Sequence, residues 1–231
     1  VGFIATILSP WPRTSAGDGA AQSRGTTLGS FSFYHVLPEY RAASLPLLKR
    51  ALALADRWTS LSPNAFSQSI LRMAGFRVFS EGFRFFVPCY PWPLGSRWRV
   101  RLASSSVLDP PGLEAMVRDH AQYGCNTLIA SRGDVRFVVV TKRRLAGGGR
   151  VRLPVSEVLF VSDLELLPDA WPAVARAVAF HDRTLAIALD DSFDPSCRIK
   201  GGTARSRVRM VRGIPNGTQL DALYSELVLL N

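Results

Sequence analysis

The segment from Leu28 to Phe76 limits the possible folds of this chain more than any other, because strand-forming and helix-forming patterns alternate along it. Residues 28–37 are rich in Phe, Tyr, Val and Leu, which suits a pleated strand, and Pro38 prevents that strand from continuing as a regular ladder member. We predict that a helix begins near Ser44, because apolar residues then recur at helical spacing. These residues are Leu45, Leu48, Leu52 and Ala55.

The same alternation occurs once more before the segment ends. Residues 58–62 suit a second strand, and residues 64–74 suit a second helix that Gly75 would close. Because a helix connects the two strands, we predict that they are parallel. The segment therefore predicts the order strand, turn, helix, strand, helix.

Three short motifs in this segment resemble the GCN5-related N-acetyltransferases, which transfer an acyl group from acyl-coenzyme A (acyl-CoA) to an amine. The motifs are Val36-Leu37-Pro38-Glu39-Tyr40-Arg41, Ser62-Pro63-Asn64 and Gly75-Phe76. The resemblance implies an α/β fold of the acyl-CoA N-acyltransferase type, with a mixed, mostly antiparallel sheet and helices on both faces. It also implies acetyl-CoA as the acyl donor and a small-molecule or protein amine as the acceptor.

The resemblance further implies which residues would hold the coenzyme. Backbone groups around Val36 would pair with the pantetheine arm, and Asn64 would steady that arm. The pyrophosphate would bind backbone amides at the helix start, where unpaired N–H groups and the helix dipole favour an anion. Those amides belong to Arg41, Ala42, Ala43, Ser44 and Leu45.

The chain departs from the family pattern at two places. Where the family has Arg-x-x-Gly-x-Gly, residues 41–46 contain no glycine and end in Pro46, so Cβ atoms crowd the phosphate position and one amide is missing. Leu71 stands where the family usually has a Tyr that protonates the leaving thiolate. His35 could accept the amine proton or be structural, and no residue is assigned as catalytic. The alternative is a non-catalytic module of this fold that binds coenzyme or protein.

A weaker copy of the central pattern occurs later in the chain. Arg50–Arg57 and Arg176–Arg183 are identical at five of eight positions with an offset of 126, although Ala- and Arg-rich helices also match by chance. We therefore predict a tandem repeat of two halves. The first spans residues 1–87 and lacks its front part, the second spans residues 98–231 and is degenerate, and residues 88–97 link them.

The copy differs from the first half at the turn before its helix. Glu165 and Asp169 lie there, and carboxylates at a helix start repel a pyrophosphate. Only the first half is therefore expected to hold a coenzyme. Near the linker, the aromatic residues Tyr90, Trp92 and Trp98 could form a ligand wall or pin the linker onto the core.

Several further elements are predicted from local patterns. Residues 77–87 suit a hairpin that turns near Glu81-Gly82, and residues 10–25 suit a loop. Gly147-Gly148-Gly149 suits a hairpin tip. The start at Val1 inside a strand suggests that upstream residues are missing. The remaining predicted strands are 1–9, 98–103, 126–131, 135–141, 157–163, 184–189 and 223–230, and the remaining predicted helices are 111–123 and 170–181.

The chain is strongly basic. In 231 residues, 28 Lys and Arg oppose 18 Asp and Glu, which favours anionic partners such as coenzyme phosphates or nucleic acid. Arg205, Arg207 and Arg209 alternate as on one strand face, so they could bind an anion or protect an edge strand. Nucleic acid is the less favoured partner, because the excess of Arg over Lys also fits a compositional bias.

Other residue types narrow the possibilities. No apolar run reaches the roughly 20 residues of a membrane helix, so no membrane partner is expected. The unpaired spacing of Cys89, Cys125 and Cys197 suits a reducing cytoplasm. No metal site is expected from His35, His120 and His181, and the acids at 190, 191 and 194 are assigned to turn formation.

Overall fold

The structure is a computed structural model in which residues 2–10, 27–88, 96–103, 113–147, 152–216, 218, 220, 222–223 and 228 are described. The chain forms two compact units, which we treat separately. The first unit comprises Val1–Phe79, Val208–Gln219 and Tyr224–Glu226, and the second comprises Ser80–Arg207, Leu220–Leu223 and Leu227–Asn231. These units differ from the predicted halves, because a late segment of the chain packs with the first unit.

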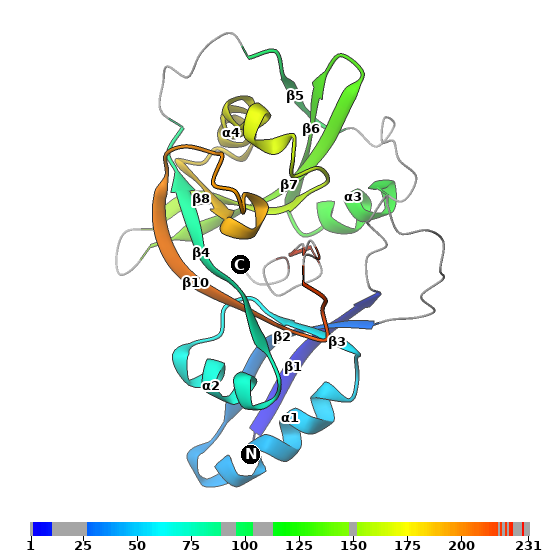
Figure 1. The fold of residues 1–231 in the computed structure, drawn as a ribbon, viewed down its shortest axis with the longest axis vertical. Coiled ribbons are helices and arrows are strands. Elements are labelled where there is room, and N and C mark those ends of the chain that lie inside the picture. The colour runs from blue at the N-terminus through cyan, green and yellow to red at the C-terminus, as the bar shows by residue number, and fades with distance from the viewer. Residues whose placement is uncertain are drawn as a thin grey trace. The chain divides into compact units, whose positions relative to one another are not determined.

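In its described residues the first unit contains the strands β1-β2-β3-β10, which are neighbours in that order (Figure 1). They are β1 (Gly2–Pro10), β2 (Thr27–Val36), β3 (Arg57–Ser60) and β10 (Thr203–Arg212), of which β10 belongs to this unit from Val208 onward. β1 pairs with β2 and β10 with β3 in antiparallel fashion, while β2 and β3 are parallel. The predicted parallel pair is therefore confirmed.

The described part of the first unit also contains short helices. The 3-10 helix η1 (Pro38–Ala43) leads directly into α1 (Ser44–Leu52), and α2 (Ala65–Met73) follows β3. Gly75 ends α2 with a φ of 84°, which glycine adopts without steric cost, and the amide of Phe76 bonds the carbonyl of Leu71. Both predicted helices are confirmed, whereas η1 was not predicted.

The first unit has its own hydrophobic core around Trp58, which is fully buried. The Trp58 ring stacks on Phe31 with ring centroids 4.6 Å apart, and its indole N–H donates to the carbonyl of Ala55. Gly29 allows this packing, because a Cβ there would lie 2.5 Å from the indole ring. The other buried members are Leu48, Ala51, Leu71, Phe76 and Met210.

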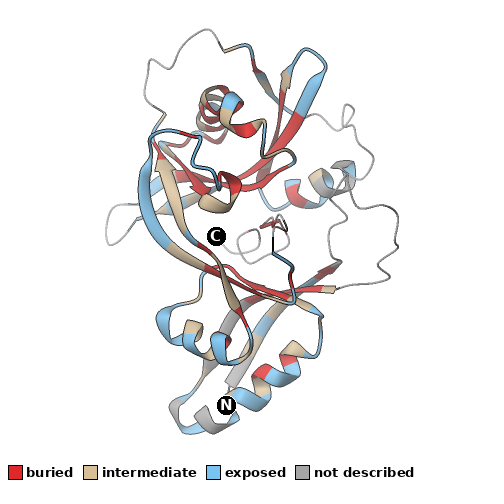
Figure 2. Cartoon of the chain, viewed as in Figure 1, coloured by how far each residue is buried: buried red, intermediate tan, exposed pale blue. Residues whose placement is uncertain are grey.

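The second unit contains a larger sheet in the order β10-β4-β9-β8-β7-β6-β5, with β8 and β9 parallel. Its strands are β4 (Arg77–Phe86, in this unit from Ser80), β5 (Arg99–Leu102), β6 (Cys125–Arg132), β7 (Val135–Ala146), β8 (Leu153–Val161) and β9 (Ala186–Asp190). Its helices are α3 (Leu113–Ala121), α4 (Leu167–Asp182) and the 3-10 helix η2 (Asp191–Phe193). Buried residues concentrate on β7, β8 and α4 (Figure 2).

Two predictions about local structure are wrong. Residues 77–87 form no hairpin, because β4 is one continuous strand whose Phe83–Phe86 pair with β9. Gly82 lies inside the strand and not in a turn, and a Cβ there would require the carboxylate of Asp191 to shift. In the predicted strand 223–230, Leu223 lies in a turn and Val228 is helical, while the intervening and following residues lie outside the described part.

Some predictions fall on residues that are not described. These include the loop between β1 and β2, most of the linker with Tyr90 and Trp92, and Gly148-Gly149. Within the described ranges, no helix is long and apolar enough to cross a membrane.

Candidate functional site

The parallel pair of the first unit stops early and leaves part of β2 without β3 beside it. In the described residues the ladder runs from Leu28–Arg57 to Ser30–Thr59, yet β2 continues to Val36. Ser32 is an extra residue in the pairing with β1, and such a bulge bends a strand. We call Phe31–Val36 the open edge of β2. A strand edge of this kind can pair with the amides and carbonyls of an extended ligand.

The corner after the open edge is more regular than predicted. In a 3-10 helix each N–H donates to the carbonyl three residues earlier, as Tyr40 does to Leu37 at 2.9 Å. The amides of Arg41, Ala42 and Ala43 are therefore used inside η1. A pyrophosphate bound to them requires η1 to unwind, so the binding role of residues 41–45 stays a prediction.

The start of α1 nevertheless suits an anion electrostatically. Its N-cap residue Ala43 makes no side-chain capping bond, and no acidic residue lies in its first turn. Ala43 and Leu45 are exposed and Ser44 is half-buried. An anion at this helix start would meet the positive end of the dipole without a competing carboxylate from α1.

The other predicted residues of the first unit have mixed outcomes. Asn64 is exposed and caps α2, with its Oδ1 accepting a bond of 2.8 Å from the amide of Ser67. Its amide nitrogen is the group left to contact a coenzyme arm. Leu71 is buried in the core of the first unit, so this position supplies no proton donor. The side chain of His35 lies outside the described residues, and both readings of it stay open.

The matching corner of the second unit is occupied by the chain's own carboxylate. Oδ1 of Asp163 accepts bonds from the amides of Glu165 and Leu166 at 3.0 and 3.2 Å, just before α4. Glu165 instead pairs with Arg198, and Asp169 with Arg132. The two predicted carboxylates are therefore present near the helix start, but both are paired with arginines, and the amides are capped by Asp163, which the sequence analysis did not predict. An Asp shortly before a helix was the available signal.

A network of buried charges lies on β4, β8, β9 and β10 of the second unit. Arg207 is 2.7 Å from Glu157 and lies over the ring of Phe83, so it is not part of a solvated stripe. Because β10 lies between β3 and β4 in the sheet order, the edge-strand interpretation of its arginines is wrong.

The acids around η2 form turns, as predicted. Asp190 caps η2 through the amide of Ser192, and Asp194 accepts bonds from the amides of Arg198 and Ile199. Burial lowers the pKa of Arg84, but hydrogen bonds to Asp194 and Asp191 outweigh burial and raise it. Among the described residues, no cluster of His, Cys, Asp or Glu could hold a metal ion.

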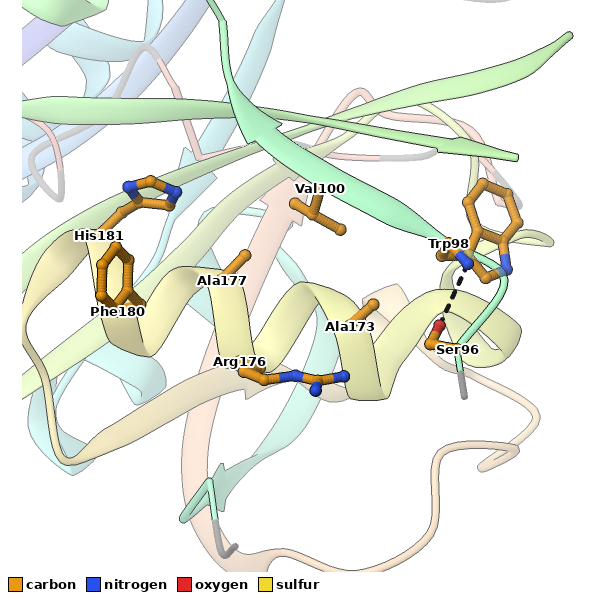
Figure 3. A pocket seen from close by; sticks show the side chains of 8 residues that line it. All are labelled: Ser96, Trp98, Val100, Ala173, Arg176, Ala177, Phe180 and His181. Carbon is orange, nitrogen blue, oxygen red and sulfur yellow. Dashed lines mark hydrogen bonds between the residues drawn. The ribbon is translucent and has the colours of Figure 1, made fainter. Parts of the chain in front are cut away.

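A surface hollow of about 590 Å³ lies between α4 and β5 in the second unit (Figure 3). The small side chains of Ala173 and Ala177 leave this space, and Phe180 and His181 lie at one end of it. Trp98 lies at the other end, but its ring is buried against Phe137 and its indole N–H donates to Asp169. Trp98 therefore packs in the core and also lines the hollow, and whether these aromatic residues pin the linker stays a prediction.

Comparison with known proteins identifies the fold. No protein-family model and no curated sequence matches the chain. Among solved structures, a GCN5-related N-acetyltransferase from Anabaena variabilis matches with a TM-score of 0.50 and 11% identity, covering 91% of this chain and 58% of that one. The GCN5-related glucosamine N-acetyltransferase region of a fungal β-N-acetylglucosaminidase matches with a TM-score of 0.53 and 12% identity, covering 91% and 31%.

A candidate acetyltransferase from Pyrococcus horikoshii also matches, with a TM-score of 0.50, 12% identity and coverage of 84% and 68%. The chain thus spans little more than half of the Anabaena protein. At these identities the likeness concerns the fold alone. The chain has the GCN5-related N-acetyltransferase fold, a mixed α/β fold with a large, mostly antiparallel sheet, as the sequence motifs implied.

Proposed function

We propose that the protein is an acyl-CoA-dependent N-acyltransferase that uses acetyl-CoA and transfers the acetyl group to a small-molecule or protein amine. The observation that carries this proposal is the open edge of β2 beside the short parallel strand β3, within this fold. In the proposal, backbone groups near Val36 pair with the amides of the pantetheine arm. Residues from Arg41 to Leu45 and Asn64 lie at the ends of that arm.

The proposed chemistry is direct attack of the amine on the thioester carbonyl. The C–N bond forms, the C–S bond breaks, and the coenzyme leaves as a thiolate that takes up the proton lost by the amine. Positioning of the two reactants and polarisation of the carbonyl by backbone N–H groups supply most of the rate in such a mechanism. Since Leu71 is an apolar core residue, water or a group other than this side chain must protonate the thiolate.

A second candidate is a non-catalytic module that binds coenzyme or protein. The helical corner η1 and the absence of a donor at Leu71 favour it, because both remove features on which turnover in this fold depends. The two candidates differ in one measurable way. An enzyme releases free thiol from acetyl-CoA faster when amines are added, whereas a binding module does not.

The site in the first unit is tested by placing a charge at the start of α1. Ala43→Asp should weaken acetyl-CoA binding by about tenfold, because one carboxylate next to a diphosphate costs roughly 1–2 kcal/mol near a protein surface. Isothermal titration calorimetry measures the affinity. Ala43→Asn is the matched control, since Asn caps a helix as well as Asp does and carries no charge.

The outcome separates the possibilities. The proposal requires that Ala43→Asn binds acetyl-CoA nearly as well as the wild-type protein does. Equal binding by wild-type protein and Ala43→Asp would show that the coenzyme lies elsewhere. Absence of binding to the wild-type protein would remove the proposed function.

A further inference from the structure

The two units share a backbone arrangement, a short parallel ladder followed by a bulge, that the sequence repeat did not reveal. In each, a parallel ladder has three pairs, ending at Ser30–Thr59 in the first unit and at Glu157–Ala188 in the second. In each, the strand then carries one extra residue two positions later, Ser32 in β2 and Leu159 in β8. Leu159 is therefore the counterpart of Ser32 on the open edge of β2.

In the second unit this position is already bound by the chain itself. The carbonyl of Leu159 accepts a hydrogen bond of 2.8 Å from the backbone amide of Ala222. We call Leu220, Ala222, Leu223 and Val228 the closing residues, and all four are at most 5% exposed. A peptide amide is the same kind of donor that an amide of a pantetheine arm would present.

Two buried side chains hold the closing residues in place. Nε2 of His120 on α3 lies 2.9 Å from the carbonyl oxygen of Leu223. The ammonium group of Lys142 on β7 donates to the carbonyl of Val228, and Lys142 is only 3% exposed. Both contacts are made to backbone carbonyls, so this surface recognises a peptide backbone in addition to apolar side chains.

We infer that the strand gap of the second unit is a binding site whose resident ligand is the chain's own peptide at the closing residues. The site therefore admits no acyl-CoA. The adjacent turn is also occupied by the chain itself, because the carboxylate of Asp163 accepts hydrogen bonds from the amides before α4. This inference rests on the proposed function for the coenzyme bound in the first unit. Together the two predict one coenzyme per chain, bound in the first unit.

Occupancy is tested first in the unmodified protein. The amide of Ala222 should exchange its hydrogen at least about 100-fold more slowly than in an unstructured peptide, because it is buried and hydrogen-bonded. Exchange at the rate of an unstructured peptide would overturn the inference. This measurement needs no variant and no ligand.

A variant then tests whether the closing residues cover the site. Ala222→Pro removes the donor N–H and should speed acetylation of Lys142 by a small amine-reactive ester by about tenfold or more. Lys49 and Lys200, which are both exposed, report in the same sample whether the reactivity of the reagent is unchanged, and circular dichroism reports whether the fold is unchanged. Ala222→Gly, which keeps the N–H, is the matched control and should leave Lys142 protected. Unchanged Lys142 labelling in Ala222→Pro would overturn the inference.

Counting bound coenzyme A separates this inference from the proposed function. One molecule per chain, bound about tenfold more weakly in Ala43→Asp, supports both. No bound molecule together with a protected Ala222 amide removes the proposed function and leaves the second site occupied as inferred. Two molecules per chain in the wild-type protein would contradict the inference whatever the first unit does.

Discussion

At the scale of single residues, identical positions in the repeated segments have taken different roles. Asp56 and Asp182 align in the repeat, but Asp56 is exposed whereas Asp182 is buried at the end of α4. The carboxylate of Asp182 accepts bonds from the side chains of Asn126, Thr141 and Ser156. Sequence comparison shows that the residue recurs, but partners on other strands decide what it does.

Asp182 should therefore matter for stability. Asp182→Ala should lower the free energy of unfolding by about 2–4 kcal/mol, because it leaves two buried hydroxyls and an amide without their acceptor. Urea denaturation measures the change. Asp119→Ala, on the exposed face of α3, should change it by less than about 0.5 kcal/mol. A loss of less than about 1 kcal/mol for Asp182→Ala would show that water replaces the carboxylate.

Prediction from sequence missed two charged residues for different reasons, one with local partners and one whose partner is distant in the chain. Asp163 ends the predicted strand 157–163 and was given no role, and Arg207 was assigned to a row of strand arginines, yet one caps amides before α4 and the other pairs with Glu157. The first could have been recognised from its place before a helix. The second could not, because only the sheet order brings β10 near β8 and β9.

At the scale of elements, the prediction was most accurate where pattern and punctuation agreed. The strand–helix–strand–helix order from β2 to α2 was predicted, since Pro38 and Gly75 mark ends and the apolar spacing is distinct. The hairpin at Glu81-Gly82 was wrong because glycine also occurs inside strands where a neighbour needs its space. Helix η1 was not predicted, because an open turn was expected after β2. A segment that contains alanines and no glycine instead favours helical backbone.

The parallel pair β2–β3 depends on the absence of a side chain at Gly29. Gly29→Ala should reduce the free energy of unfolding by about 1–3 kcal/mol, because the new methyl group forces the Trp58 ring out of its packed position. Chemical denaturation followed by tryptophan fluorescence detects the change. Ser62→Ala, at an exposed position after β3, serves as the control. Equal stability of both variants would show that the first core tolerates an extra methyl group.

At the scale of the whole molecule, the first unit is completed by residues far along the chain. Met210 on β10 is fully buried in the core with Phe31, Trp58 and Phe76, more than 130 residues after the last of them. The predicted halves divided the chain at one linker, so the first half could not include β10. The repeat itself stays a prediction, although the matched ladders and bulges of β2 and β8 support it.

The contribution of β10 to the core of the first unit is testable with two methionines. Met210→Ala should cost about 2–5 kcal/mol of unfolding free energy, because it leaves a cavity beside Trp58. Met73→Ala is the matched control, since Met73 is 72% exposed and its loss should cost less than about 1 kcal/mol. Thermal or urea denaturation distinguishes them. Similar costs would mean that β10 does not complete the first core in solution.

The central claim is that acyl-CoA binds along the open edge of β2 in the first unit. The most direct measurement is a backbone amide NMR titration with acetyl-CoA. The account predicts shift changes at residues 31–45 and at Asn64, with Leu159 and Asp163–Leu166 unaffected. Changes confined to the second unit, or no changes at saturating acetyl-CoA, would contradict it.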